Sequence, residues 1–156
     1  MCGRFALTTS PEVIAAVFRL SDAPVLRPRY NIAPTQDALI VRVMDGQREG
    51  ELLHWGLVPF WSRDQSINAR LINARSETAA GRAAFRNAFR KRRCLVPASG
   101  FFEWRREDRR KRPFYIRSAT GSPLALAGLW EEWRDPDRPD APIMESFAIL
   151  TTEPNV

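Results

Sequence analysis

The chain begins with the residues MCGRF, which place a cysteine directly after the initiator methionine. If Met1 is removed, Cys2 carries a free α-amine beside its thiol, with ordinary pKa values of about 7.7–8.0 and about 8.5. The amine can condense with an aldehyde to an imine, and the thiol can then close onto the imine carbon as a thiazolidine ring. The same residue could instead attack an acyl carbon, as N-terminal nucleophiles do. Alternatively, it is an idle cysteine that follows the start codon.

Few other residues offer competing chemistry. The single histidine, His54, lies inside an apolar strand pattern, which favours a structural role, although any Cys–His or Ser–His–Asp site would have to use it. The sequence contains no GxSxG elbow, no P-loop and no dinucleotide-binding glycine pattern. It also contains no CxxC pair and no HExxH spacing. We therefore expect neither a metal nor a cofactor.

The charge of the chain comes mainly from arginine. The formal net charge is +6, and all but Lys91 and Lys111 of the 24 basic residues are arginine, whose planar fork suits phosphate oxygens. Any one arginine could simply occupy a solvated face. The runs RKRR at 90–93 and RRKR at 109–112 are more specific, and they indicate a polyanionic partner.

The hydrophobic pattern predicts helices in two places. Residues 11–20 favour a helix with Ser10 as its N-cap and Pro11 at its first position. Residues 76–90 are expected to form a second helix, which would present Arg82, Arg86 and Arg90 on one basic face.

Strands account for most of the remaining apolar segments. We expect strands at 38–44, 51–58, 94–104 (two strands around a turn), 113–117, 124–133 and 146–152, with the charged stretch 105–112 as a hairpin tip. Several strands with two helices predict a single α+β domain, built as a curled, mostly antiparallel sheet or irregular barrel flanked by helices.

Six segments, taken in order, resemble the SOS response-associated peptidase (SRAP) family. They are MCGRF (1–5), RYNIAPTQ (29–36), HWGLVPFW (54–61), INARSET (72–78), FRNAFRKRRCLVPASGFFEW (85–104) and FAILTTEPN (147–155). The resemblance implies a protein that links Cys2 covalently to abasic sites in single-stranded DNA, because an opened abasic sugar presents an aldehyde. The adduct would shield the lesion during the DNA damage response. The resemblance also implies peptidase-like removal of Met1 by the protein itself, and lyase-like chemistry.

The resemblance assigns roles by position in this sequence. Cys2 would be the nucleophile, Asn73 would hydrogen-bond near it and orient the sugar, and Glu103 would move protons as a general acid and base. Phosphates would be held by Arg4, Asn31, Arg75, Arg82 and Arg86, and bases would be contacted or wedged by Pro34 and Trp61. From the residues alone, Asn73 could equally cap a turn, and Glu103 could pair with the neighbouring arginines.

Family members continue past the strand that resembles FAILTT and carry a catalytic histidine shortly after it, whereas this chain ends at Val156. We therefore expect an SRAP-like domain over residues 1–156 that lacks its C-terminal part. Three functions remain open: a DNA crosslinking enzyme, a cysteine peptidase with an N-terminal nucleophile, and a non-catalytic module that binds single-stranded DNA.

The expected cellular localisation follows from features that the sequence lacks. No apolar run approaches the length of a membrane span, and the N-terminus has no apolar h-region. Two cysteines without a secretory signal favour a reducing cytosol. We expect a monomeric cytoplasmic protein, associated with the bacterial nucleoid when it is bound to single-stranded DNA that contains abasic sites, and with no membrane partner.

Overall fold

Ten strands and a few short helices make up the chain in the computed structural model, which describes residues 2–107 and 110–153. The strands are β1 (Phe5–Leu7), β2 (Arg29–Ile32), β3 (Asp37–Met44), β4 (Gln47–Trp55), β5 (Asn73–Arg75), β6 (Arg93–Ala98), β7 (Gly100–Glu107), β8 (Arg110–Ile116), β9 (Leu124–Trp133) and β10 (Met144–Thr151). The helices are α1 (Pro11–Phe18), α2 (Ser76–Ala79), α3 (Arg86–Lys91) and the 3₁₀ helix η1 (Gln65–Arg70).

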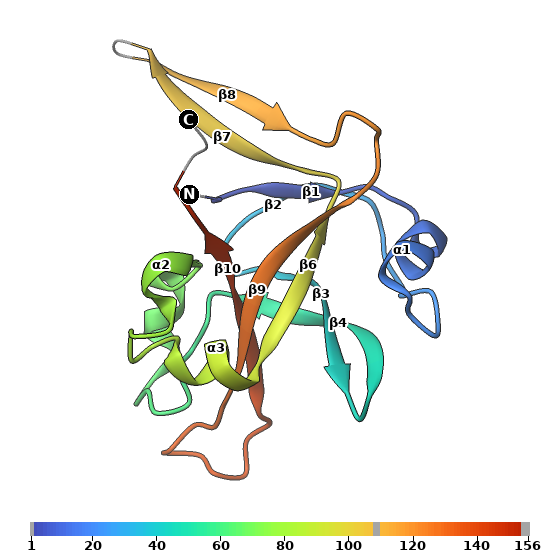
Figure 1. Cartoon of the computed structure of the whole chain (residues 1–156). Coiled ribbons are helices and arrows are strands. Elements are labelled where there is room, and N and C mark those ends of the chain that lie inside the picture. The colour runs from blue at the N-terminus through green and yellow to red at the C-terminus, as the bar shows by residue number, and fades with distance from the viewer. Residues whose placement is uncertain (1, 108–109, 154–156) are drawn as a thin grey trace.

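Five of the strands close into a barrel. The order β4-β3-β6-β9-β10 is antiparallel throughout, and β10 then returns to β4 in a parallel pairing that sets Ser146 opposite His54 and Phe147 opposite Trp55. β5 extends the sheet along β10, and Figure 1 shows these strands surrounding the centre of the molecule. The predicted α+β fold with an irregular, mostly antiparallel barrel is therefore confirmed.

The barrel core is organised around Trp55, which has no exposed surface. Its ring lies 5.1 Å from the ring of Phe5 in an edge-on arrangement and 6.3 Å from the ring of Phe147 in a stacked one. The indole Nε1 donates to the carbonyl of Ile72 at 3.0 Å, so the polar atom is satisfied inside the core. Burial of each such side chain stabilises the fold by about 1.5–3 kcal/mol, which ties β1 and the segment before β5 to the barrel.

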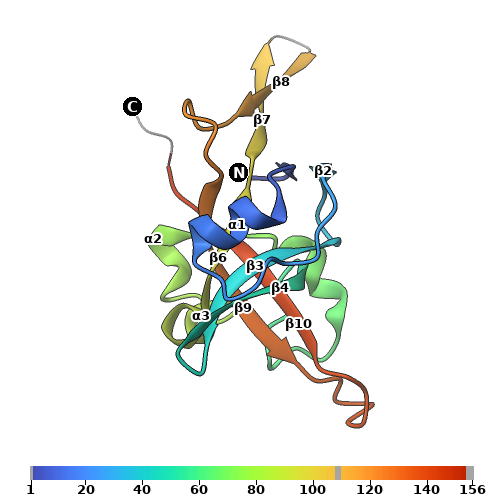
Figure 2. The same cartoon turned by 90° about the vertical axis from the view of Figure 1, so that its right-hand side faces the viewer.

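A second, four-stranded sheet has the order β2-β1-β7-β8. Its β7–β8 hairpin projects away from the barrel in both views (Figure 1 and Figure 2). The two strands pack closely at Gly100, where a Cβ atom would lie only 2.5 Å from the Tyr115 ring, so a larger residue would push them apart. Arg109, at the expected hairpin tip, lies outside the described residues.

The prediction of the first helix is confirmed. α1 begins at Pro11, and the Ser10 hydroxyl accepts a hydrogen bond from the Val13 N–H at 3.4 Å. It ends earlier than expected, because Arg19 adopts a left-handed conformation at φ 55°. Among the described residues, no helix is long and apolar enough to cross a membrane.

The prediction of one helix over residues 76–90 is wrong. α2 and α3 are separated by a turn over residues 80–85, so Arg82 is not on a continuous helical face with Arg86. Ala79 and Phe85 both pack into the same buried cluster, yet six residues of straight helix would point them about 120° apart. The turn allows both to face the core. The Arg86 N–H still donates to the Arg82 carbonyl at 2.8 Å, so these two arginines stay one turn apart.

Candidate active site

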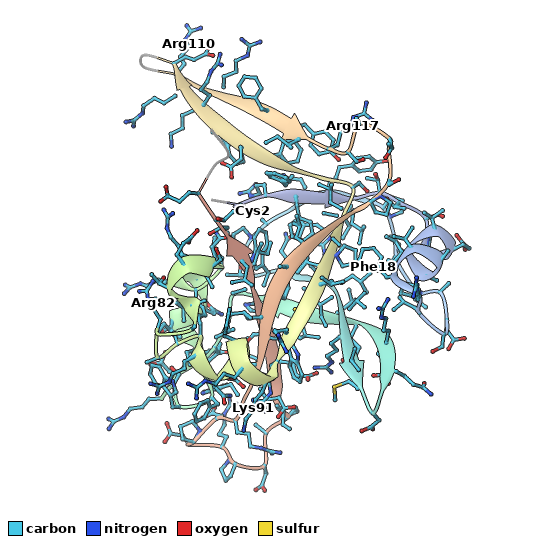
Figure 3. All side chains as sticks on the ribbon, in the orientation of Figure 1. Cys2, Phe18, Arg82, Lys91, Arg110 and Arg117 are labelled. Carbon is cyan, nitrogen blue, oxygen red and sulfur yellow. The ribbon has the colours of Figure 1, made fainter. Side chains whose placement is uncertain are left out.

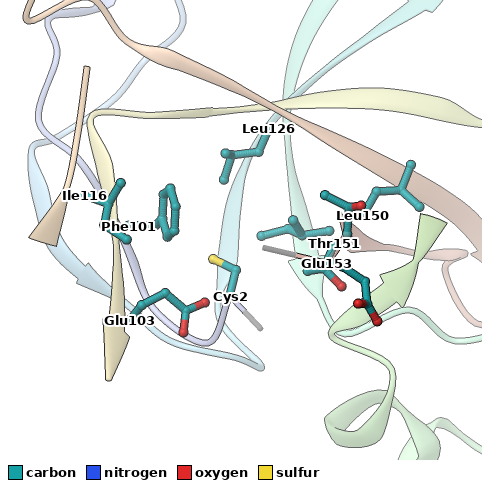
Figure 4. Close-up of a pocket in the computed structure, with 10 residues that line it drawn as sticks. Cys2, Phe101, Glu103, Ile116, Leu126, Leu150, Thr151 and Glu153 are labelled. Atoms are coloured by element: carbon teal, nitrogen blue, oxygen red, sulfur yellow. The ribbon is translucent and has the colours of Figure 1, made fainter. Parts of the chain in front are cut away.

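A cavity of about 560 Å³ lies between the barrel and the four-stranded sheet. The start of the chain, the β7–β8 hairpin, β9 and the end of β10 all contribute to its wall (Figure 4). The described residues that line it are Cys2, Phe101, Glu103, Ile116, Leu126, Ile149, Leu150, Thr151, Thr152 and Glu153. Most of the wall is apolar, and the polar groups concentrate near Cys2 and the end of β10.

The Cys2 thiol lines the cavity yet is only 7% exposed. The pKa of the thiol is raised to about 11, mainly by burial; the hydrogen bond to the Arg4 carbonyl opposes this shift, and the nearby Glu103 carboxylate adds to it. The thiol therefore stays protonated at neutral pH. Any reaction through its sulfur needs a group that accepts this proton.

Asn73 anchors the backbone at Cys2. It lies on β5, where the parallel pairing with β10 sets it opposite Ile149, and its Nδ2 donates to the Cys2 carbonyl at 2.9 Å. Its Oδ1 and the Thr151 hydroxyl are buried and lack a hydrogen-bond partner among the described residues. Since buried polar atoms are nearly always paired, these two atoms stand ready to bond a group that enters beside Cys2.

Glu103 approaches Cys2 from the sheet side. It is half-buried, and it lies two residues from Phe101 on β7, so both side chains point to the same side of the strand. Figure 4 shows the Glu103 carboxylate and the Phe101 ring on either side of the Cys2 sulfur. The structure thus brings together the three residues predicted to be catalytic, although they are separated by up to 101 positions in the sequence.

The end of β10 is held beside the cavity by Glu77 of α2. The Glu77 carboxylate accepts hydrogen bonds from the Thr152 hydroxyl at 2.8 Å and the Glu153 N–H at 3.4 Å. Hydrogen bonds from its own backbone N–H and from Thr152 lower the pKa of Glu77. Thr151, Thr152 and Glu153 line the cavity but were not predicted as site residues, although all three belong to the segment FAILTTEPN.

The predicted DNA-contacting residues lie in several separate places on the molecule. Arg4, directly before β1, donates to the side chain of Asn31 on β2 at 3.2 Å. Pro34 lies in the turn after β2. Arg75, at the end of β5, lies 3.8 Å from Glu153 of the cavity wall, and its side chain is 53% exposed. Arg75 therefore lies beside the cavity wall.

Trp61 and Arg86 meet at a second hollow of about 270 Å³. Its lining residues are Phe60, Trp61, Ala83, Arg86, Asn87, Arg90 and Lys91. The indole Nε1 of Trp61 donates to the Ala83 carbonyl at 3.4 Å, which holds the ring at the surface with half of its area exposed. Arg82 is exposed in the turn before α3 and is not part of this lining.

The single histidine takes no part in the cavity. The Nε2 atom of His54 lies 3.1 Å from the Asn68 side-chain amide, and its Nδ1 atom lies 3.7 Å from Asp37. Within residues 2–107 and 110–153, no group of three or more His, Cys, Asp and Glu side chains is placed to hold a metal ion.

Known proteins show similarity over the whole chain. A family profile described as SOS response associated peptidase (SRAP) matches residues 1–156. The abasic site processing protein YoqW of Bacillus subtilis is 37% identical over 161 residues, which cover 99% of this chain and 70% of that protein. The abasic site processing protein YedK of Escherichia coli is 33% identical over 135 residues, covering 83% of this chain and 59% of YedK. A crystal structure of a Bacteroides thetaiotaomicron protein superposes with a TM-score of 0.88 at 29% identity, covering 99% of this chain and 69% of that one.

Proposed function

The chain belongs to the SOS response associated peptidase family, and on that premise we propose that it processes abasic sites in single-stranded DNA by linking Cys2 to the opened sugar. One observation carries the proposal. Cys2 and Glu103 line one cavity, Asn73 bonds the Cys2 carbonyl beside it, and none of the ten described residues that line this cavity is arginine or lysine. An abasic deoxyribose is uncharged and has no base, so a cavity of this kind suits it.

The reaction begins with removal of Met1, because a peptide bond to Met1 leaves Cys2 without a free amine. Hydrolysis of that bond releases methionine and exposes the α-amine beside the thiol. In this proposal the protein performs the cleavage itself, which gives the family's peptidase name a role in maturation.

The crosslink then forms in two steps. The Cys2 amine attacks the aldehyde carbon of the opened sugar, and loss of one water gives an imine. The sulfur next attacks the imine carbon, a C–S bond forms, and the thiol proton ends on the nitrogen. Because burial keeps the thiol protonated at neutral pH, Glu103 is the group that takes this proton and passes it on.

Asn73 and Thr151 position the reacting groups. The bond from Asn73 Nδ2 to the Cys2 carbonyl fixes the backbone from which both the amine and the thiol extend. The unpaired Asn73 Oδ1 and Thr151 hydroxyl can bond the amine or a sugar hydroxyl. Holding the partners in one geometry removes much of the entropy cost of a reaction between two molecules.

The cations around the cavity bind the rest of the DNA strand. Arg4 with Asn31, Arg75, and the Arg82–Arg86 pair would hold phosphates. Trp61 and Pro34 would contact bases, and aromatic stacking tolerates any base.

A cysteine peptidase acting on other proteins has less support. A Cys–His site would need His54, which bonds Asn68 and lies outside the cavity lining. A non-catalytic module would leave the arrangement of Asn73 and Glu103 around Cys2 without a purpose.

Intact-mass measurement separates these functions. Protein mixed with a single-stranded oligonucleotide containing one abasic site should gain the oligonucleotide mass minus one water, starting from a chain that lacks Met1. A matched oligonucleotide carrying tetrahydrofuran at the same position has no aldehyde and should bind without any covalent product. A stable adduct on Met1-bearing protein, or on the tetrahydrofuran strand, contradicts the mechanism. Binding without an adduct would favour the non-catalytic module, and cleavage of an added peptide would favour the peptidase.

A further inference from the structure

The β7–β8 hairpin places like charges directly opposite one another. Arg105 pairs with Arg112 across the two strands, and Arg106 pairs with Lys111. Like charges at directly opposed positions destabilise a β-hairpin, and here two such pairs are consecutive. The repulsion within these two pairs therefore lowers the stability of the hairpin, and the hairpin could form without these charges.

Few carboxylates offset these charges. Arg105 forms an ion pair with Glu107, in which its Nε donates at 2.9 Å. Among the described residues, no carboxylate lies within ion-pair distance of Arg106, Lys111 or Arg112, and all three side chains are exposed. A dense, exposed and largely unpaired cationic segment is what a polyanion neutralises on binding.

The two cation pairs lie on opposite faces of the hairpin. Neighbouring positions of a strand point to opposite sides, so Arg105 and Arg112 share a face with Phe101 and Ile116, which line the Cys2 cavity. Arg106 and Lys111 point the other way. Only the first pair therefore continues the surface of the candidate active site toward the hairpin tip.

An aromatic ring lies between the cavity and this first cation pair. Phe114 sits opposite Glu103 and is 37% exposed. The guanidinium carbons of Arg105 and Arg112 lie 5.1 Å and 5.5 Å from the centre of its ring. An exposed ring flanked by guanidinium groups is the combination with which proteins stack a base and hold its neighbouring phosphates.

We propose that Phe114, Arg105 and Arg112 form a DNA-binding arm, which holds the strand on one side of the abasic sugar. This proposal rests on the proposed function. The Arg105–Arg112 pair is two residues beyond Glu103 along the hairpin, a distance of about 6.8 Å, so it lies within reach of a nucleotide next to the lesion. Figure 3 shows the Cys2 region between Arg110 on the hairpin and Arg82 on the α2–α3 side. The strand is thus held on both sides of the reacting sugar.

The chain offers a matched control for this arm. Arg105→Ala with Arg112→Ala removes the cavity-side pair, and Arg106→Ala with Lys111→Ala removes the same charge from the opposite face. Affinity for a single-stranded oligonucleotide with a central tetrahydrofuran site is measured over a series of salt concentrations. Loss of two phosphate contacts should flatten the log–log slope by about 1.4 in the first variant only, at about 0.7 per phosphate. Both variants relieve a like-charge pair, so neither should unfold at a lower temperature than the parent.

Oligonucleotides that end at the tetrahydrofuran site on either the 5′ or the 3′ side locate the arm. The difference in the log–log slope between the Arg105→Ala, Arg112→Ala variant and the parent should disappear with one of these two strands and persist with the other. Equal slopes in the first variant and the parent overturn the proposal. An equal flattening of the slope in both double variants also overturns it, because it would indicate long-range electrostatic attraction only. Arg105→Lys with Arg112→Lys keeps the charge and should restore most of the slope. Because these measurements use a strand that cannot crosslink, their outcome is separate from the success or failure of the crosslinking reaction.

Discussion

Two hollows of the surface, the cavity at Cys2 and the hollow beside Trp61, have opposite electrostatic character. The cavity at Cys2 is lined by apolar side chains, two threonines and two carboxylates. The hollow beside Trp61 is lined by Arg86, Arg90 and Lys91 together with two aromatic rings that are about half exposed. A uniform basic groove would hold phosphates everywhere, including where the reaction must occur. Under the proposed function, this separation keeps phosphates out of the cavity while cations elsewhere on the surface bind the DNA backbone.

This contrast makes the covalent step and DNA binding separable by mutation. Changes in the cavity should alter the rate or stability of the adduct and leave the affinity for a non-reacting strand intact. Changes at the basic hollow should do the reverse.

The largest effect is expected from Cys2→Ala. This variant keeps the α-amine and can still form an imine, which borohydride would trap, but it cannot close the thiazolidine ring. No stable adduct should survive denaturing electrophoresis without the reductant. Cys94→Ala, which removes the other buried cysteine from β6, should crosslink like the parent. A stable, reductant-independent adduct of Cys2→Ala would rule out the thiazolidine.

Glu103→Gln should slow the covalent step at saturating DNA by about 10²–10⁴-fold, because the amide cannot exchange a proton. Affinity for the tetrahydrofuran strand should remain near that of the parent. Glu107→Gln, which changes the next carboxylate on β7, should leave this rate unchanged. If binding falls together with the rate, Glu103 supports the structure and does not transfer protons.

The pH dependence of Cys2 alkylation tests the burial of the thiol. In Met1-bearing Cys94→Ala protein, no α-amine adjoins the thiol and Cys2 is the single thiol. Burial favours the neutral form, so reaction with iodoacetamide should be slow at pH 7 and should rise through pH 9 towards an apparent pKa of about 11. Relative to a thiol at 9, the thiolate fraction at pH 7 should be lower by about 100-fold. A profile that reaches its plateau by pH 9 would mean that the cavity is open to water at the sulfur.

The smallest effect should come from Arg82→Ala combined with Arg86→Ala. Loss of two phosphate contacts should flatten the log–log salt dependence of binding by about 1.4, at about 0.7 per phosphate, while the rate at saturating DNA stays constant. The control is Arg19→Ala with Arg48→Ala, which removes two exposed arginines beside the end of α1. Equal flattening in both variants would show that net charge, not contact at α3, sets the affinity.

Features that depend on short stretches of chain could be predicted from the sequence. The apolar runs of β3 and β9 and the Ser10–Pro11 start of α1 are local signals, and the structure has those elements. The break between α2 and α3 was not predictable in this way. It depends on Ala79 and Phe85 reaching one buried cluster, which only the assembled barrel defines.

The candidate site shows the same limit. The chemistry of a cysteine at position 2 indicates Cys2 as a site residue, whereas Asn73 and Glu103 are indicated only by the resemblance to family motifs. No local pattern indicates that β4 and β10 pair in parallel, or that Glu77 holds Thr152 and Glu153 beside Cys2. These contacts join segments about 75–90 residues apart, and such pairings leave no periodic trace in either segment.

The strand β10 determines at which stage of folding the cavity around Cys2 is complete. One end of β10 completes the barrel against β4, and its other end supplies Thr151 to the cavity that encloses Cys2. Contacts between residues so far apart in sequence form only after a large loop has closed, which makes them slow and late. Until β10 is seated, the Cys2 thiol lacks the part of its enclosure that Ile149, Leu150 and Thr151 supply. A nascent or partly unfolded chain therefore carries an ordinary, more exposed cysteine, and the buried thiol with a raised pKa belongs to the fully folded molecule alone.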